Sequence, residues 1–265
     1  MSTDRTRTDP LTGAVRSGAD AQDGRRLDIH NSDIPLLCRA CEARHKGICG
    51  GLDPDQLQRL SRHTHKHVLR ENVEVIAPQQ PVTTYSNILS GVVKLTKLMP
   101  DGRQQIVSLQ FAPDFLGRPF KASNEYSAEA ATDIRVCSFP RKVLEDMIDE
   151  SPDLGRRLYE QSLKELDEAR DWMLTLGRRT AAEKVASFLY LIATHIDPEV
   201  DLVHGGIRFD LPLKRADIAD FLGLTIETVS RQLTKLRKAN IIEIEMNRTV
   251  IVPNVERLKA ACAAS

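Results

Sequence analysis

The stretch "DIADFLGLTIETVSRQLTKL" (Asp217–Leu236) has the pattern of two short helices joined by a tight turn. Gly223 stands where the chain must bend, and Thr225 can cap the second helix. The segment that follows, "IIEIEMNRTVIV" (241–252), predicts a β-hairpin wing. Apolar residues at helical spacing predict the core side of the two helices: Ile218, Ala219 and Leu222, then Ile226, Val229, Leu233 and Leu236.

The other face of the second helix carries side chains that can read DNA. Base edges meet the start of a recognition helix, where arginine can donate to guanine and glutamate can accept from cytosine. Lysines further along suit phosphate neutralisation. The alternative is that these polar residues are only the solvent-exposed side of a surface helix. The glycine turn, the cap and the wing together disfavour it. We predict a site for double-stranded DNA: Thr225, Glu227, Ser230, Arg231, Lys235 and Lys238.

Upstream, the segment 151–179 predicts one long amphipathic helix. Its apolar and small residues are spaced 3, 4, 3, 4 and 3 apart: Tyr159, Ser162, Leu166, Ala169, Met173 and Leu176. Such a seam is typical of a parallel contact between two helices, here from two subunits of a homodimer. A surface helix covering the rest of the chain is the alternative. Ser162 and Ala169 would make the pairing weak, as a switch requires.

Between Val68 and Phe139, alternating apolar runs punctuated by turn signals predict an antiparallel β-roll of the jelly-roll type. The Asp101-Gly102 dipeptide between two such runs predicts a hairpin turn. The polar segment 1–30 predicts a flexible tail. The fold class expected is therefore α+β.

Lys plus Arg and Asp plus Glu each number 37, so any basic face must be local. We expect a cytoplasmic protein without membrane contact, because no segment has the apolar core of a signal peptide or a membrane span. We also expect no enzyme, since the sequence has no nucleophile–base pair and no glycine-rich phosphate loop.

Three of the five cysteines crowd into "CRACEARHKGICGG" (38–51), namely Cys38, Cys41 and Cys49. Crowding of this kind in a reducing compartment points to a metal centre more than to disulfides. An iron–sulfur cluster, a zinc ion and a simple thiol redox site all remain open on spacing alone. Cys262, near the C-terminus, has no partner spacing and is expected to be incidental.

A β-roll, a long helix and a winged helix-turn-helix, in that order, resemble the CRP/FNR family of bacterial transcription regulators. The residues "TIETVSR" (225–231) are similar to the FNR branch, which implies a palindrome of the TTGAT-N4-ATCAA kind. The residue patterns and the resemblance together predict five parts: a tail (1–30), a cysteine-rich cluster-binding segment (31–52), a sensor β-roll (53–150), a dimerisation helix (151–178) and a DNA-binding domain (179–265).

The family resemblance also bears on ligands. Members that bind cyclic nucleotides use an acidic "GE" turn and a following arginine, whereas Arg118 follows Gly117 here and serine stands near Ser127. We therefore expect no cyclic nucleotide. A member that senses another small molecule or haem in the β-roll is an alternative.

FNR-type sensors hold a [4Fe–4S] cluster with three near cysteines and one distant cysteine. The strand "RVCSFPR" (135–141) resembles the distant site, so the resemblance implies the ligands Cys38, Cys41, Cys49 and Cys137. Their spacing is similar to that of the FnrN and FnrL kinds. Zinc or thiol chemistry at the same residues remains the alternative.

The resemblance implies a mechanism. Oxygen would destroy the cluster, release the cysteine-rich segment and shift a dimer to a monomer that leaves DNA. It further implies activation through contact with RNA polymerase, at the hairpin tip around Asp101 and Gly102.

Overall fold

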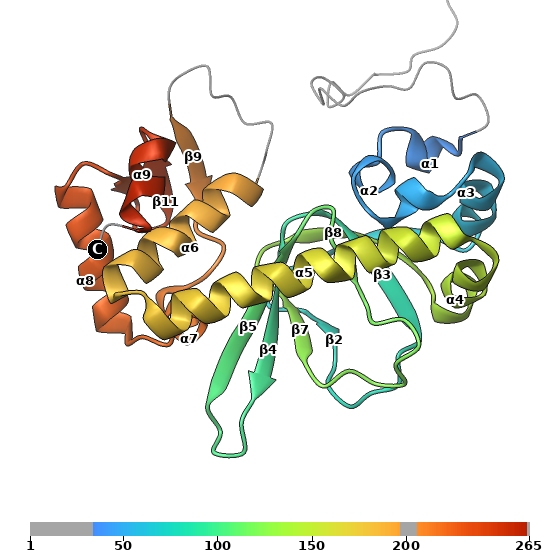
Figure 1. The fold of residues 1–265 in the computed structure, drawn as a ribbon, viewed down its shortest axis with the longest axis horizontal. Coiled ribbons are helices and arrows are strands. Elements are labelled where there is room, and N and C mark those ends of the chain that lie inside the picture. The colour runs from blue at the N-terminus through green and yellow to red at the C-terminus, as the bar shows by residue number, and fades with distance from the viewer. Residues whose placement is uncertain (1–33, 197–205, 264–265) are drawn as a thin grey trace, which may run out of the picture.

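The computed structural model describes residues 34–196 and 206–263. Figure 1 shows a β-roll and a C-terminal helical module joined by one long helix. The segment expected to be a flexible tail, residues 1–30, lies outside the described residues.

The β-roll consists of two four-stranded antiparallel sheets with the orders β1-β8-β3-β6 and β2-β7-β4-β5. Apolar side chains that alternate along the strands form the core between the sheets, including Ile88, Val93 and Val136. The strands are β1 (His65–Leu69), β2 (Glu74–Ile76), β3 (Thr84–Ser90), β4 (Val92–Leu98), β5 (Gln104–Phe111), β6 (Phe115–Leu116), β7 (Ser127–Ala130) and β8 (Ile134–Pro140). The predicted hairpin turn joins β4 to β5, with Gly102 at φ 84°.

Four short helical segments precede the roll: α1 (Leu36–Arg39), α2 (Glu42–His45), η1 (Ile48–Gly51) and α3 (Pro54–Ser61). Asp53 starts α3 with a capping box, because its side chain accepts from the Gln56 backbone at 2.8 Å and the Gln56 side chain accepts in return. These segments pack on the outer face of β3 and β8, in a core that includes Tyr85, Phe115 and Phe139.

Two helices follow the roll, α4 (Arg141–Glu150) and α5 (Pro152–Arg178). Ser151 caps α5 and Pro152 occupies its first position, where a missing N–H costs nothing. Figure 1 shows α5 running from the N-terminal helices to the C-terminal module. It is one uninterrupted helix, as the sequence predicts.

The C-terminal module contains α6 (Ala181–His195), β9 (Ile207–Asp210), α7 (Arg215–Leu222), α8 (Ile226–Lys238), β10 (Glu243–Glu245), β11 (Thr249–Val252) and α9 (Val255–Ala261). The predicted wing is confirmed as the β10–β11 pair. Ile226 was wrongly assigned to the core: it is the first residue of α8 and is 46% exposed. The α+β architecture predicted from the sequence is confirmed.

The two modules contact each other through β4 and β5. The Lys94 ammonium lies 3.0 Å from Glu129 in the roll and 3.5 Å from Asp217 in α7. The Gln105 side-chain amide donates to the backbone carbonyl of Asp220 at 2.6 Å. Ile106 on β5 belongs to the same apolar core as α6 and α7. Within residues 34–196 and 206–263, no helix is both long and apolar enough to cross a membrane.

Candidate nucleic-acid interface and cysteine site

Helix α8 begins where the sequence predicts it. Thr225 caps it, because its hydroxyl accepts a hydrogen bond from the backbone N–H of Thr228 at 3.2 Å. Gly223 ends α7 in the left-handed region at φ 61°, which favours glycine. Val229 and Leu233 are buried against α6 and α7. The glycine turn and the cap therefore set the direction of α8.

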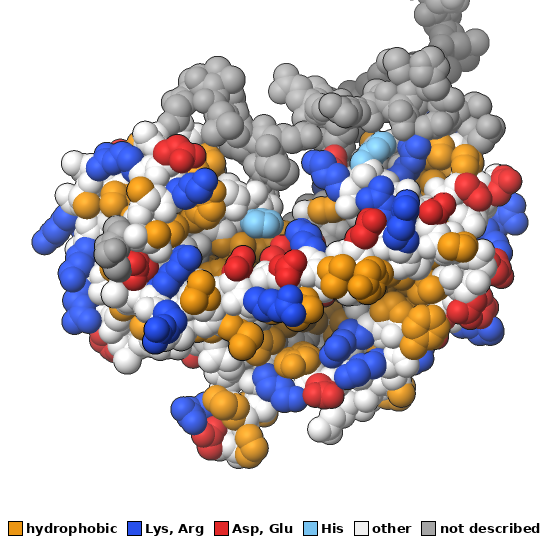
Figure 2. Space-filling view, viewed as in Figure 1, with side chains coloured by type: hydrophobic (Ala, Val, Ile, Leu, Met, Phe, Trp, Pro, Cys, Tyr) orange, Lys and Arg blue, Asp and Glu red, His pale blue; other side chains and the backbone are white. Residues whose placement is uncertain are grey.

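The predicted DNA-reading residues form one exposed face of α8. Glu227, Ser230 and Arg231 lie on one side of its first turns, since residues three and four apart share a helix face. All three are exposed, and so are Lys235 and Lys238, which extend that face toward the helix end. Figure 2 shows Lys and Arg side chains along the edge where Figure 1 places α8. This face can approach a polyanion without rearrangement.

Glu227 is an acceptor at neutral pH. Its own backbone N–H and the hydroxyl of Thr225 lower its pKa. A carboxylate at this place can accept a hydrogen bond from the amino group of a base. Thr225 therefore supports the reading face as well as capping the helix.

The structure brings together the four cysteines that the family resemblance implies as ligands. Cys38 lies in α1, Cys41 directly precedes α2, Cys49 lies in η1 and Cys137 lies in β8. All four line one cavity of about 20 Å³. Cys262 lies elsewhere: it is buried in the core of the C-terminal module, so it is a packing residue there.

The cavity lies between the outer face of the β-roll and the N-terminal helices. On that face Cys137 stands directly opposite Asn87 on β3 and directly opposite Lys66 on β1. Residues directly opposite on neighbouring strands share a face. Lys66, Cys137 and Asn87 therefore form a row across three strands, and this row faces the helices that carry the other three cysteines.

The sequence analysis did not predict a role for two residues of this row. The Asn87 amide is fully buried and donates to the Cys49 sulfur at 3.3 Å. The Lys66 ammonium donates to the backbone carbonyl of Leu37, next to Cys38. Neither residue belongs to a motif, and only strand register reveals them.

Burial raises the pKa of three thiols of this site, those of Cys38, Cys49 and Cys137. It raises the pKa of Cys49, and the neighbouring thiols Cys41 and Cys137 raise it further. Burial raises the pKa of Cys137 to about 12, with Cys41 raising it and Lys66 opposing the shift. Burial and Cys41 also raise the pKa of Cys38. Binding of a cation by these residues would therefore release protons.

The donor set fits an iron–sulfur group. Four cysteines, the number that a [4Fe–4S] cluster requires, line one small and largely apolar cavity. Among the described residues, no three His, Cys, Asp or Glu side chains are already arranged as ligands of a single metal ion.

The predicted seam of α5 is open to solvent in the single chain. Tyr159 is 64% exposed, Leu166 45% and Met173 73%. Ser162 and Ala169, between them, are also exposed, and Leu176 is half-buried. Part of the seam lines the cleft between α5 and the β-roll, and its exposed residues are not covered by any described part of the chain.

Comparisons with known proteins show the family of this chain. A family profile described as "Crp-like helix-turn-helix domain" matches residues 183–261, and one described as "Cyclic nucleotide-binding domain" matches residues 66–151. A Rhizobium leguminosarum bv. viciae protein named "Probable transcriptional activator" is 55% identical over 90% of this chain and 98% of its own length. The chain belongs to the CRP/FNR family.

Further relatives place this CRP/FNR regulator in the FNR branch. "Transcriptional activator protein FnrL" of Cereibacter sphaeroides is 41% identical over 85% of this chain and 93% of its own. The solved structure of FixK2 from Bradyrhizobium japonicum matches with 34% identity and a TM-score of 0.67, over 76% of this chain and 98% of the other. The chain is thus a DNA-binding transcriptional activator, and its family is not one of enzymes, as predicted.

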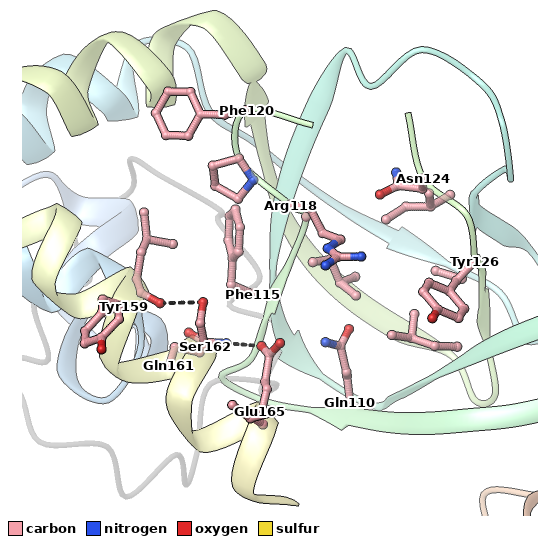
Figure 3. A pocket seen from close by; sticks show the side chains of 18 of the residues that line it. Gln110, Phe115, Arg118, Phe120, Asn124, Tyr126, Tyr159, Gln161, Ser162 and Glu165 are labelled. Carbon is pink, nitrogen blue, oxygen red and sulfur yellow. Dashed lines mark hydrogen bonds between the residues drawn. The ribbon is translucent and has the colours of Figure 1, made fainter. Parts of the chain in front are cut away.

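The CRP/FNR regulator has a wide cleft of about 810 Å³ between α5 and the β-roll. Figure 3 shows Gln110, Asn124 and Tyr126 on the roll side, with Arg118 among them. Glu165 faces them from α5, and burial raises its pKa. Arg118 occupies the position where the resemblance places an acidic residue in nucleotide-binding members, so the cleft has a different charge pattern.

The β4–β5 hairpin tip of the regulator is exposed, including Asp101 and Gly102. The Asp101 carboxylate pairs with Arg103 at 2.8 Å, and a Cβ on Gly102 would meet nothing within 4 Å. Leu98 beside the tip is 70% exposed. The tip is a small protruding surface with apolar and charged groups together.

Proposed function

We propose that this activator responds to oxygen, binding a TTGAT-N4-ATCAA-type palindrome as a homodimer while Cys38, Cys41, Cys49 and Cys137 hold a [4Fe–4S] cluster. One observation carries the proposal: cysteines from three N-terminal segments and from β8 line one small cavity. Such a group would supply an oxygen-labile tie between parts of the chain that are far apart in sequence.

The cysteine segment is placed to support the long helix. A Cβ on Gly51 would lie 2.6 Å from the Asp153 carbonyl oxygen, so η1 and the first turn of α5 are in close contact. Gly50 lies beside Arg157, one turn further along. Loss of the tie at Cys49 would therefore loosen the start of α5.

The α5 seam would carry the change to the dimer. Its exposed row of Tyr159, Leu166 and Met173 suits a second copy of the same helix, with the small or polar Ser162 and Ala169 keeping the contact weak. A weak contact can be shifted by a few kcal/mol, which is the scale on which one lost tie acts. A monomer would then contact only one half-site of the palindrome and bind DNA more weakly.

The palindrome follows from two copies of α8. Glu227, Ser230 and Arg231 would read each half-site, while Lys235 and Lys238 would contact phosphates. We further propose that the hairpin tip around Asp101 and Gly102 contacts RNA polymerase, because it protrudes from the roll and is exposed.

A cyclic nucleotide is not part of the proposal. The cleft between α5 and the β-roll presents Glu165 on α5, and Arg118 lies where the resemblance places an acidic residue. The size of the cleft favours a second candidate, a regulator that senses another small molecule there, independent of the cysteines.

Purification without air tests the proposal. We expect about four iron and four sulfide per chain, a brown colour that bleaches in air, and a dimer that becomes monomeric as it bleaches. Cys41→Ser should lose the iron and the anoxic DNA binding, while Cys262→Ser should keep both. A colourless protein with one zinc ion, or DNA binding unaffected by Cys41→Ser, would contradict it and favour the second candidate.

A further inference from the structure

One wall of the cysteine cavity is formed by the β-roll, and Cys137 is the cysteine that this wall contributes. This wall is the row of Lys66, Cys137 and Asn87 across β1, β8 and β3. Both neighbours of Cys137 carry groups that favour negative charge on sulfur, an ammonium on one side and an amide N–H donor on the other. The row is fixed by backbone pairing, so its geometry does not depend on the helices that close the cavity.

Asn87 has no evident role in the fold itself. Its side chain is 0% exposed, its amide N–H donates to Cys49, and its carbonyl oxygen has no partner among the described residues. An orphaned buried carbonyl is unfavourable, and an apolar side chain would fill the same place without that cost. We therefore attribute the amide side chain at position 87 to its hydrogen bond with the Cys49 sulfur.

Lys66 contributes charge at the opposite end of the row. Its ammonium is held by the Leu37 carbonyl and lines the same cavity as the four cysteines. A cluster with four thiolates is anionic, and its potential depends on net charge and on hydrogen bonds to sulfur. A cation beside the cavity would make the reduced, more negative form easier to reach.

We propose that Asn87 and Lys66 are positioning residues that hold the sulfur ligands and raise the reduction potential of the group bound there. This inference rests on the proposed function, since it concerns the same cavity. It adds two residues outside the cysteine motif, with separate contributions: a donor to the Cys49 sulfur and a cation beside Cys38 and Cys137.

The test uses the full-length protein, prepared without air. Asn87→Leu removes the donor at similar volume, and Lys66→Met removes the charge but keeps the aliphatic stem. Both should hold a cluster that loses iron to a chelator about 10- to 100-fold faster than the wild type. Both should also have a lower midpoint potential in a dye-mediated redox titration. Lys66→Arg should restore the wild-type values.

Two control variants separate this effect from general damage. Ser86→Ala removes a buried polar group from the same strand, on the face that points to Ser138 and away from the cysteines. Lys46→Met removes a charge between Cys41 and Cys49 in the sequence, where the ammonium pairs with Glu42 outside the cavity. Both controls should keep the wild-type potential and iron retention.

The outcomes distinguish the two proposals. A wild-type protein with iron, together with unchanged potential and iron retention in Lys66→Met and Asn87→Leu, overturns the inference and leaves the proposed function standing. A wild-type protein without iron overturns the proposed function and this inference with it. Equal shifts in the Lys46→Met control would also overturn the inference. If Asn87→Leu does not fold, Lys66→Met decides, because Lys66 is exposed.

Discussion

At the scale of single residues, the proposed function assigns the choice of DNA sequence and the strength of DNA binding to different side chains. Arg231 lies in the first turns of α8 beside Glu227, the part of the helix that would meet base edges. Lys238 lies at the last position of the helix, two turns further on. Both are exposed and neither takes part in an ion pair among the described residues, so their substitution tests DNA contacts and not folding.

Arg231→Ala should lower the preference for the TTGAT half-site by about 1–3 kcal/mol, because a bidentate contact with guanine is lost. Lys238→Ala should weaken binding to every sequence and reduce the salt slope by about one. Anisotropy titrations of anoxic protein against intact and mutated half-sites, at several salt concentrations, measure both. If both variants lost affinity equally for the intact and the mutated half-sites, the assignment of sequence choice to Arg231 would be contradicted.

At the scale of elements, helix α5 connects the cysteine-rich segment to the proposed dimer interface. The N-terminal end of the helix contacts η1, where two glycines permit close approach. The middle of the helix presents the exposed seam. Helix α5 is therefore supported by η1 at its N-terminal end and carries the apolar seam along its middle. Substitutions can alter the contact with η1 and the seam separately.

Gly51→Ala should destabilise the fold by about 1–3 kcal/mol, because the added Cβ overlaps the Asp153 carbonyl and the backbone must move. Gly177→Ala is the matched control in α5, since a Cβ there meets nothing within 4 Å. That change should be neutral or stabilise by about 0.5–1 kcal/mol. Urea unfolding curves of both variants give the comparison, and a fully stable Gly51→Ala protein would show that η1 does not bear on α5.

Leu166→Asp should weaken the dimer about tenfold or more, because two carboxylates would face each other across the parallel seam. Leu174→Asp is the control: Leu174 is 55% exposed, similar to Leu166 at 45%, but lies outside the seam spacing. Sedimentation equilibrium of the anoxic proteins reports both. A dimer insensitive to Leu166→Asp and disrupted by Leu174→Asp would place the subunit contact on another face of α5.

At the scale of the whole molecule, the β-roll and the C-terminal module are held together by a polar contact beside a shared apolar core. Burial alone would lower the pKa of Lys94, but the hydrogen bond to Glu129 and the charge of Asp217 raise it. The lysine is therefore a cation held between the roll and α7. Together with the hydrogen bond from Gln105 to Asp220, it fixes α7, and hence α8, relative to the β-roll.

Asp217→Asn should loosen this contact and lower affinity for the full palindrome several-fold, because two copies of α8 must be spaced to match one helical turn of DNA. Affinity for a single half-site should change little, since Asp217 is not on the reading face. Arg103→Ala, at an exposed ion pair on the hairpin, is the control for a lost surface charge. Equal losses on palindrome and half-site would contradict a role in spacing.

The amino-acid sequence by itself determined the parts whose signals are local. Helix periodicity, the cap at Thr225 and the turn at Gly223 predicted the helix-turn-helix of α7 and α8, because each depends on residues a few positions apart. The same local logic gave the long α5 and the Asp101-Gly102 turn. Cys137 was linked to the other cysteines only through a family resemblance, because nothing in the spacing connects residues 49 and 137.

Only the tertiary structure decided the surroundings of the sulfur atoms and the contact between modules. Asn87 and Lys66 flank Cys137 because strand pairing sets them opposite it, and pairing between strands distant in sequence leaves no local pattern. The contact of Lys94 with Asp217 spans two modules for the same reason. Local propensities act within a few residues, whereas burial and register are properties of the whole folded chain.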